Sequence, residues 1–236
     1  MIAEQVAEVG RAVVIYDAER FSACDPRWFD ADYYRTNGAV LHSTTGRGGV
    51  LLLERRDETW VLRHYHRGGF VAKLVYDHYL WTGRKRNRAF REWRLLAHLH
   101  ALGLPAPRPI AARVVRAGLT YSGDLITERL PAVPCSSLMA KGALDAAGWR
   151  AAGACVARCH RGGLDHADLT LNNLLLGRDG TAHVIDLDRA VLRAPGPWAS
   201  ANLARLKRSL IKLTPDWTAA DRDAAWRELM AGYSAA

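Results

Sequence analysis

The sequence predicts an α+β protein with a strand-rich first half and a mainly helical second half. Three observations lead to this prediction. Residues 39–80 contain strand-like runs with short polar breaks, residues 145–161 read as one long helix, and a hinge-like stretch at 128–134 separates the halves. Strands and helices do not alternate regularly, so two lobes are expected rather than a doubly wound sheet.

The strands of the first half are predicted from the composition of each run and from the turn-forming residues that separate the runs. The runs AVLHSTT, VLLLERR and TWVLRHY are rich in β-branched, leucine and aromatic residues, and they are separated by G-R-G-G and D-E. A helix is predicted over 87–102, because Gly103 and a proline-rich segment follow it. Further strands are predicted near 110–116 and 123–130.

The second half contains the long helix over 145–161, which ends at Gly162-Gly163, and then a loop, a hairpin and a helical C-terminal region. We therefore expect one domain over residues 1–236. Its N-lobe covers residues 1–127 and includes an N-terminal extension, and its compact C-lobe covers residues 128–236.

The composition is that of a soluble protein with an anionic partner. The 236 residues are 49% hydrophobic and 24% charged, which argues against disorder. The formal net charge of +9 favours nucleic acid, an acidic lipid surface or a phosphorylated substrate, without choosing among them. No apolar run reaches the ~18–20 residues of a membrane span. The N-terminus lacks a signal-peptide pattern, so we expect a cytoplasmic location.

The segment over residues 166–188 holds the candidate catalytic residues. It reads H-A-D-L-T-L-N-N-L-L-L-G-R-D-G-T-A-H-V-I-D-L-D, and D-G between two apolar runs is a hairpin signal. If Asp179-Gly180 is a two-residue turn, Asn173 lies opposite Asp186. Asp168 lies on the loop that leads into the hairpin. We therefore expect three oxygen-bearing side chains to converge at its open end.

Three such side chains suit a magnesium–nucleotide site. Mg²⁺ prefers hard oxygen ligands and takes few of them from protein, since phosphates and water supply the rest. A further carboxylate could accept the proton of an attacking hydroxyl, which typically contributes ~10²–10⁴-fold. The alternative is a polar loop in which Asp168 caps a turn and Asn173 satisfies backbone groups. The joint placement of the three residues favours the functional interpretation.

The block H-A-D-L-T-L-N-N resembles the catalytic loop H-R-D-L-x-x-x-N of kinase-like enzymes, and V-I-D-L-D resembles their D-F-G segment. The resemblance implies a bilobal protein-kinase-like fold that uses ATP and Mg²⁺. It implies that Asp168 is the catalytic base, that Asn173 and Asp186 hold Mg²⁺, and that His166 is mainly an organiser. Asp188 is interpreted as a strand-end charge, with a supporting role at the site as the alternative.

Glycines and a hinge in the first half are candidates for nucleotide binding. Gly46, Gly48 and Gly49 lie between two predicted strands, where glycine lets backbone N–H groups approach phosphate oxygens. An ordinary hairpin turn explains the same glycines. By the same resemblance, backbone near Glu128 is expected to hold the adenine ring.

A buried carboxylate is expected on the helix over 87–102. Glu92 falls on the same face as its leucines, and an inward carboxylate needs a cation. Kinase-like enzymes use a strand lysine that also holds the nucleotide phosphates. Here the matching position is Arg63, and the nearest lysine is Lys73 in F-V-A-K-L. We interpret Arg63 as the partner of Glu92 and of the phosphates, while Lys73 remains the alternative clamp.

The order of the motifs narrows the resemblance. G-R-G-G, L-R-H-Y-H-R-G-G-F-V-A-K-L, F-R-E-W-R-L-L, G-L-P-A-P-R-P-I-A-A-R, L-I-T-E and the catalytic block together resemble the lipopolysaccharide kinase family, most closely 3-deoxy-D-manno-octulosonic acid (Kdo) kinases. The resemblance implies phosphorylation of a Kdo hydroxyl on a lipid A precursor in lipopolysaccharide core biosynthesis. It also implies a peripheral position at the cytoplasmic face of the bacterial inner membrane, on an anionic surface.

Two other interpretations remain open at this point. The first is a related kinase, acting on a core heptose or resembling aminoglycoside and choline kinases. The second is a non-catalytic pseudokinase or a basic nucleic-acid-binding module. Retention of Asp168, Asn173 and Asp186 argues against an inactive kinase, and no nucleic-acid-reading motif is present, so no nucleic-acid partner is expected.

Overall fold

The structure is a computed structural model that describes residues 2–44, 49–55, 58–65, 79–80, 87–118 and 120–236. The chain divides into two compact units. Unit 1 comprises Met1–Ala101 and Arg108–Arg129, and unit 2 comprises Leu102–Pro107 and Leu130–Ala236. The chain first enters unit 2 at Leu102 and returns to it for good at Leu130, whereas the sequence analysis places the lobe boundary between 127 and 128. The segment Leu102–Pro107 belongs to unit 2, where the N–H of Val184 donates to the carbonyl of Pro105 at 2.8 Å.

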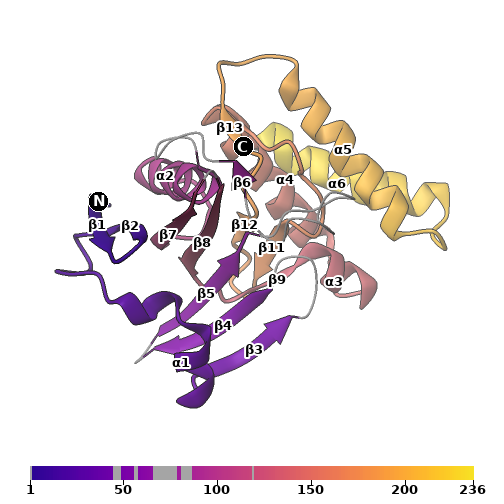
Figure 1. Cartoon of the computed structure of the whole chain (residues 1–236). Helices are drawn as coiled ribbons and strands as arrows, with labels where there is room; N and C mark the ends of the chain where they lie inside the picture. Colours follow the sequence, from indigo (N-terminus) through magenta and orange to yellow (C-terminus); the bar gives the residue numbers. More distant parts are fainter. Residues whose placement is uncertain (1, 45–48, 56–57, 66–78, 81–86, 119) are drawn as a thin grey trace. The chain divides into compact units, whose positions relative to one another are not determined.

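Unit 1 is built on an antiparallel sheet, with the order β1-β2-β7-β8-β5-β4-β3 in the described residues and β6 paired with β8 (Figure 1). Its strands are β1 (Glu4–Val9), β2 (Ala12–Asp17), β3 (Val40–Thr44), β4 (Val50–Arg55), β5 (Glu58–His64), β6 (Tyr79–Leu80), β7 (Pro109–Ala117) and β8 (Thr120–Glu128). Its helices are a 3-10 turn (Pro26–Phe29), α1 (Ala31–Thr36) and α2 (Arg88–Ala101). Helix α2 packs against β7 and β8.

The five strands and the helix predicted in this half are confirmed by β3, β4, β5, β7, β8 and α2. The N-terminal extension contains a β1–β2 hairpin that the sequence did not lead us to expect. Its Gly10-Arg11 loop has Gly10 at φ +59, a placement typical of type II′ hairpin turns. Strand β2 then pairs with β7, so the extension is part of the sheet.

The core of unit 1 holds two tryptophans in contact. Trp28 and Trp60 are each 1% exposed, and their rings pack edge to face. The ring centres lie 5.9 Å apart, and the angle between the ring planes is 89°. Leu53 and Ile110 are fully buried beside them in the same cluster. Aromatic pairs of this geometry contribute about 0.5–1.5 kcal/mol beyond the burial of their surface. The packing anchors β4 and β5, and β5 carries Arg63.

Unit 2 is mainly helical. It contains α3 (Cys135–Ala140), α4 (Ala146–Arg161), α5 (Trp198–Leu213), α6 (Ala219–Ala235) and the short strands β9 (Ala132–Pro134), β10 (Leu164–Asp165), β11 (Leu174–Gly177), β12 (Ala182–Val184) and β13 (Val191–Leu192). Strands β9, β11 and β12 form one sheet, and β10 pairs with β13.

Helices α4 and α6 approach each other closely at two glycines. A Cβ atom on Gly153 would lie 1.9 Å from the carbonyl oxygen of Leu229, and one on Gly232 would lie 2.0 Å from that of Arg150. Any side chain at either glycine would therefore force the helices apart. This contact fixes α4, the helix that leads directly into β10 and the candidate catalytic loop.

The predicted α+β class is confirmed, with a β-rich unit 1 and a mainly helical unit 2. No helix in the described ranges is long and apolar enough to cross a membrane.

Candidate active site

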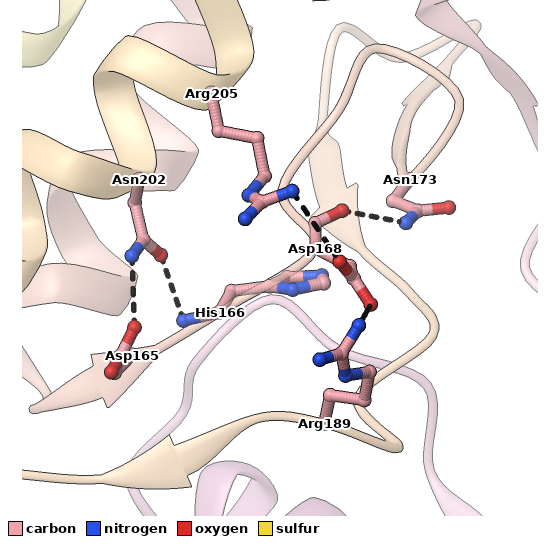
Figure 2. Close-up of polar contacts among 7 residues, drawn as sticks. All are labelled: Asp165, His166, Asp168, Asn173, Arg189, Asn202 and Arg205. Atoms are coloured by element: carbon pink, nitrogen blue, oxygen red, sulfur yellow. Dashed lines mark hydrogen bonds and ion pairs between the residues drawn. The ribbon is translucent and has the colours of Figure 1, made fainter.

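The loop between β10 and β11 is held in place by His166. Its backbone N–H donates to Oδ1 of Asn202 at 2.8 Å, and its Nε2 lies 3.0 Å from the carbonyl oxygen of Ile185 (Figure 2 shows His166 and Asn202). The side chain is buried, and burial lowers the pKa of His166. A neutral ring with the proton on Nε2 donates to Ile185 and ties the loop to the segment that follows β12.

Asp168 is the third residue of this loop. Its side chain is 35% exposed, and its carboxylate lies 3.2 Å from Nη1 of Arg189 and 3.6 Å from Nη1 of Arg205 (Figure 2). Its backbone carbonyl accepts a 3.0 Å hydrogen bond from Nδ2 of Asn173. The structure therefore brings Asp168 and Asn173 together, and it leaves the Asp168 carboxylate reachable from solvent.

The hairpin after Asn173 is present, but its predicted register is wrong by one residue. Leu174 pairs with Val184 and Leu176 with Ala182, so the loop consists of residues 178–180. The N–H of Ile185 donates to the carbonyl of Asn173 at 3.0 Å, where the two-residue turn had placed Asp186. Asp186 comes one residue later.

The turn chemistry explains this correction. A type I′ turn needs positive φ at both central residues, but only Gly180, at φ +79, adopts it here. The side chain of Asp179 instead accepts the N–H of Thr181 at 3.0 Å, and Gly180 donates to Gly177 at 3.1 Å. Such local bonds favour a type I turn followed by a left-handed glycine, which is the three-residue hairpin loop.

Asp186 has an unusual backbone conformation. Its φ of +61 is the one positive value among non-glycine residues in the described part of the chain. Aspartate tolerates the left-handed region better than most residues, and conformations of this kind concentrate at functional sites. The chain therefore changes direction directly after the hairpin, at the residue that the kinase resemblance marks as a metal ligand.

The donor chemistry of the hairpin end fits a hard cation. Asn173 uses its Nδ2 on Asp168, which leaves the amide oxygen as an acceptor, and Asp186 is an exposed carboxylate. Both are oxygen ligands of the kind that Mg²⁺ takes, with phosphates and water completing its shell. No cluster of three or more His, Cys, Asp or Glu suited to a metal occurs in the described ranges, and all four cysteines are free.

Unit 1 contains the expected buried carboxylate. Glu92 on α2 is 3% exposed, and it accepts hydrogen bonds from Nη2 of Arg63 and from the hydroxyl of Tyr65. The guanidinium of Arg63 also lies 5.1 Å from the centre of the Tyr65 ring. Arg63 is thus the cation that the inward carboxylate requires. No sequence pattern singled out Tyr65, although it ends the same strand-like run, TWVLRHY.

The remaining predicted nucleotide-binding residues are placed only in part. Gly46, Gly48 and Lys73 lie outside the described residues. Gly49 directly precedes β4, and its carbonyl accepts the N–H of His64 at 3.5 Å. Glu128 ends β8, and its N–H donates to the carbonyl of Arg108 at 2.9 Å. Their proposed roles stay predictions.

Three residues of the site were missed by sequence reasoning: Asn202, Arg189 and Arg205. Asn202 is 4% exposed on α5, where it also donates to Asp165 and to the carbonyl of Trp198, both at 2.8 Å. A signal existed for each. Asn202 lies four and eight residues before Leu206 and Leu210, on the buried face of α5. Arg205 directly precedes Leu206, and Arg189 directly follows D-L-D.

A strand-rich unit with a buried glutamate paired to a strand cation, and a helical unit with an Asp–Asn loop, parallel kinase-like phosphotransferases. Arg63 stands here where those enzymes use lysine. The chain belongs to the lipopolysaccharide kinase (Kdo/WaaP) family, whose sequence profile matches residues 31–233. It is accordingly a phosphotransferase that acts on a hydroxyl group.

Curated relatives agree with this assignment. A 3-deoxy-D-manno-octulosonic acid kinase of Xanthomonas campestris pv. campestris (strain B100) is 40% identical over 96% of this chain and 91% of its own. The protein of that name from Vibrio vulnificus (strain YJ016) is 36% identical over 99% of this chain and 98% of its own. Among solved structures, the bifunctional kinase-methyltransferase WbdD is similar at 16% identity with a TM-score of 0.46. The match covers 81% of this chain and 47% of WbdD.

Proposed function

We propose that this protein transfers the γ-phosphoryl group of ATP to a hydroxyl of the Kdo sugar on a lipid A precursor. The observation that carries the proposal is the shared name of the curated relatives, which match this chain almost end to end. The alternative is a kinase of a core heptose, because the matching family is described as lipopolysaccharide kinase (Kdo/WaaP) and that description states no single acceptor.

We assign the proton transfer to Asp168. Its carboxylate accepts the proton of the acceptor hydroxyl while the hydroxyl oxygen bonds to the γ-phosphorus and the bond to the β–γ bridging oxygen breaks. ADP leaves, and the proton on Asp168 passes to solvent. The partial exposure of Asp168 and its place on a loop held by His166 and Asn173 support this role.

We take residues 1–236 to form one kinase-like domain, and we assign nucleotide-related roles within each unit by the family resemblance. In unit 1, Arg63, oriented by Glu92, binds phosphate oxygens, with Lys73 as the alternative cation. In unit 2, Asn173 and Asp186 are the candidate Mg²⁺ ligands. When bound, Mg²⁺ would neutralise charge on the transferring phosphates.

The glycines at 46, 48 and 49 are assigned to phosphate binding through their backbone, and the backbone near Glu128 to adenine. These roles rest on the family resemblance.

We further propose that the protein works at the cytoplasmic face of the inner membrane as a peripheral protein. The formal net charge of +9 supports this, since the leaflet and the phosphorylated lipid acceptor are both anionic. Binding to vesicles of zwitterionic lipid with and without about one-third anionic lipid tests the idea. Screening by salt should release the protein from the anionic vesicles.

An acceptor assay tests the function itself. Purified protein and γ-labelled ATP are incubated with a Kdo-bearing lipid A precursor, with the same precursor lacking Kdo, and with a heptose-bearing core acceptor. Label should enter the Kdo-bearing precursor and be released as a phosphorylated sugar on mild acid treatment. Label that enters only the Kdo-free or heptose-bearing acceptor would contradict the proposal.

A further inference from the structure

Two arginines from different elements converge on the carboxylate of Asp168. Arg189 follows the hairpin, and Arg205 lies on α5 (Figure 2). Nη1 of Arg189 lies 3.2 Å from Oδ2, and Nη1 of Arg205 lies 3.6 Å from Oδ1, so each guanidinium addresses a different oxygen. Figure 2 shows them approaching from opposite sides of the carboxylate.

The exposure of these groups indicates that their ion pairs add little to folding stability. The side chains of Arg189 and Arg205 are 66% and 46% exposed, and ion pairs in such solvent contact contribute little to stability. Each guanidinium has five N–H donors, and its contact with Asp168 is made through one nitrogen. Within this group of three side chains, two cations face one carboxylate.

We propose that Arg189 and Arg205 form the subsite that binds the carboxylate of the acceptor sugar. The inference rests on the proposed function and deepens it, because it states how the acceptor is recognised. A guanidinium binds a carboxylate through two parallel hydrogen bonds, which fixes the orientation of the carboxylate as well as its position. Kdo is a sugar acid, so its carboxylate lies within a few bonds of its hydroxyls.

The position of the arginines favours the acceptor over the nucleotide as the source of the anion. Asp168 contacts the attacking hydroxyl, and the γ-phosphorus lies on the far side of that hydroxyl oxygen in an in-line transfer. Groups that touch the Asp168 carboxylate therefore lie on the acceptor side. A hydroxyl that reaches Asp168 would bring the carboxylate of the same sugar toward the remaining donors of the two arginines.

The test compares two acceptors that differ only in this group: the Kdo-bearing precursor and the same precursor with the Kdo carboxylate converted to a carboxamide. For the wild-type protein we expect a KM about 10–100-fold higher for the carboxamide, since a charge-assisted pair is lost. Arg189→Ala and Arg205→Ala should raise the KM for the acid acceptor by about tenfold or more. Both variants should bind the acid and the carboxamide almost equally, with the KM for ATP unchanged.

Arg208→Ala is the matched control, because Arg208 is an exposed arginine on the same helix. It should keep the wild-type preference for the acid. Arg205→Lys should restore part of the preference, since lysine supplies the charge without the planar fork. Thermal unfolding of each variant confirms that it is folded.

The possible failures are distinct. If the wild-type protein does not phosphorylate the Kdo-bearing precursor, both the proposed function and this inference are contradicted. If the wild-type protein is active but both arginine variants keep the full preference for the acid, only the inference is overturned. A rise in the KM for ATP with that preference intact would assign the arginines to nucleotide phosphate and would equally overturn it.

Discussion

The side-chain oxygen of Asn202 accepts the backbone N–H of His166 at 2.8 Å, and its amide nitrogen donates to Oδ1 of Asp165 at 2.8 Å (Figure 2). One buried amide on α5 therefore holds both the end of β10 and the first residue of the catalytic loop. A donor and an acceptor are both needed here, and the side-chain amide of Asn202 supplies them on separate atoms of one group.

Asn202→Asp should separate the acceptor role of this side chain toward His166 from its donor role toward Asp165. The new carboxylate keeps the acceptor for His166 but faces Asp165 with a like charge in a buried place. We expect the free energy of unfolding at neutral pH to fall by about 2 kcal/mol or more. We also expect kcat to fall more than the KM for ATP rises. Urea denaturation measures the first effect.

Ser209→Ala is the control for this variant, because Ser209 makes one longer contact from the same helix, accepting the N–H of Leu171 at 3.3 Å. Its loss should cost less than about 1 kcal/mol. An Asn202→Asp protein as stable as the wild type would show that the amide does not hold the loop.

Asp168→Asn should abolish most phosphotransfer. The amide cannot accept the proton of the acceptor hydroxyl, so kcat should fall by about 10²–10⁴-fold. ATP binding, measured by calorimetry, should be retained because Asp168 is assigned to the acceptor. Asp216→Asn, at an exposed aspartate in the α5–α6 connection, is the control and should keep wild-type activity. Undiminished phosphotransfer by Asp168→Asn would refute the assigned base.

The Arg63–Glu92 pair should affect nucleotide binding and stability separately. Arg63→Ala should raise the KM for ATP by about tenfold or more, since a charge-assisted contact with phosphate is lost. Glu92→Gln should lower the free energy of unfolding by about 1–3 kcal/mol, because two donors lose a buried carboxylate.

Arg91→Ala, at an exposed position next to Glu92 on α2, is the control. It should change neither the KM for ATP nor the free energy of unfolding. Normal ATP binding by Arg63→Ala would move the phosphate role to Lys73.

Gly180 should be replaceable only by residues that tolerate a left-handed backbone. Its φ is +79, and a Cβ atom added there would meet nothing within 4 Å beyond its chain neighbours, so the cost of Gly180→Ala is backbone strain rather than collision. We expect a loss of about 1 kcal/mol in the free energy of unfolding. Gly180→Asn should recover part of it, because asparagine visits this region more readily. Equal stability of the alanine and asparagine variants would contradict the turn assignment.

His160 should make the protein less stable in mild acid. Burial lowers the pKa of His160 from its ordinary value of 6.5 to about 4. Between these two values the unfolded chain binds a proton that the folded chain does not, so the free energy of unfolding falls as the pH falls through this window. The part of the free energy of unfolding that depends on a neutral His160 is fully present above pH 6.5. Urea denaturation from pH 7 to pH 4 measures it.

His160→Gln should reduce this pH dependence without removing it, since burial also lowers the pKa of His166. Tyr233→Phe is the matched control. It removes the Tyr233 hydroxyl, which lies 2.9 Å from Nδ1 of His160, but leaves the His160 ring buried. The pH dependence of the free energy of unfolding should therefore persist. A His160→Gln protein with the wild-type pH profile would show that another group is responsible.

Features that depend on near neighbours in the chain were predictable. The helical spacing that puts Glu92 on an apolar face, and the strand-like run that carries Arg63, are local patterns, and burial of a carboxylate requires a cation whatever the fold. Asp168 and Asn173 lie on one short loop, so their proximity also follows from the sequence. The hairpin was predicted for the same reason, but its register depends on whether Asp179 bonds its own backbone, which a D-G pair alone does not reveal.

The α+β class, the main elements and the residues that resemble a kinase site could be inferred from the sequence alone, because periodicity, turn residues and motif spacing are properties of short segments. Folding in three dimensions was needed to show that Asn202 bonds Asp165 across 37 residues and that Arg189 and Arg205 meet at Asp168. Such contacts arise when the hydrophobic face of α5 packs and places its polar neighbours. Periodicity predicts which face is buried, but only packing decides which residue each polar side chain meets.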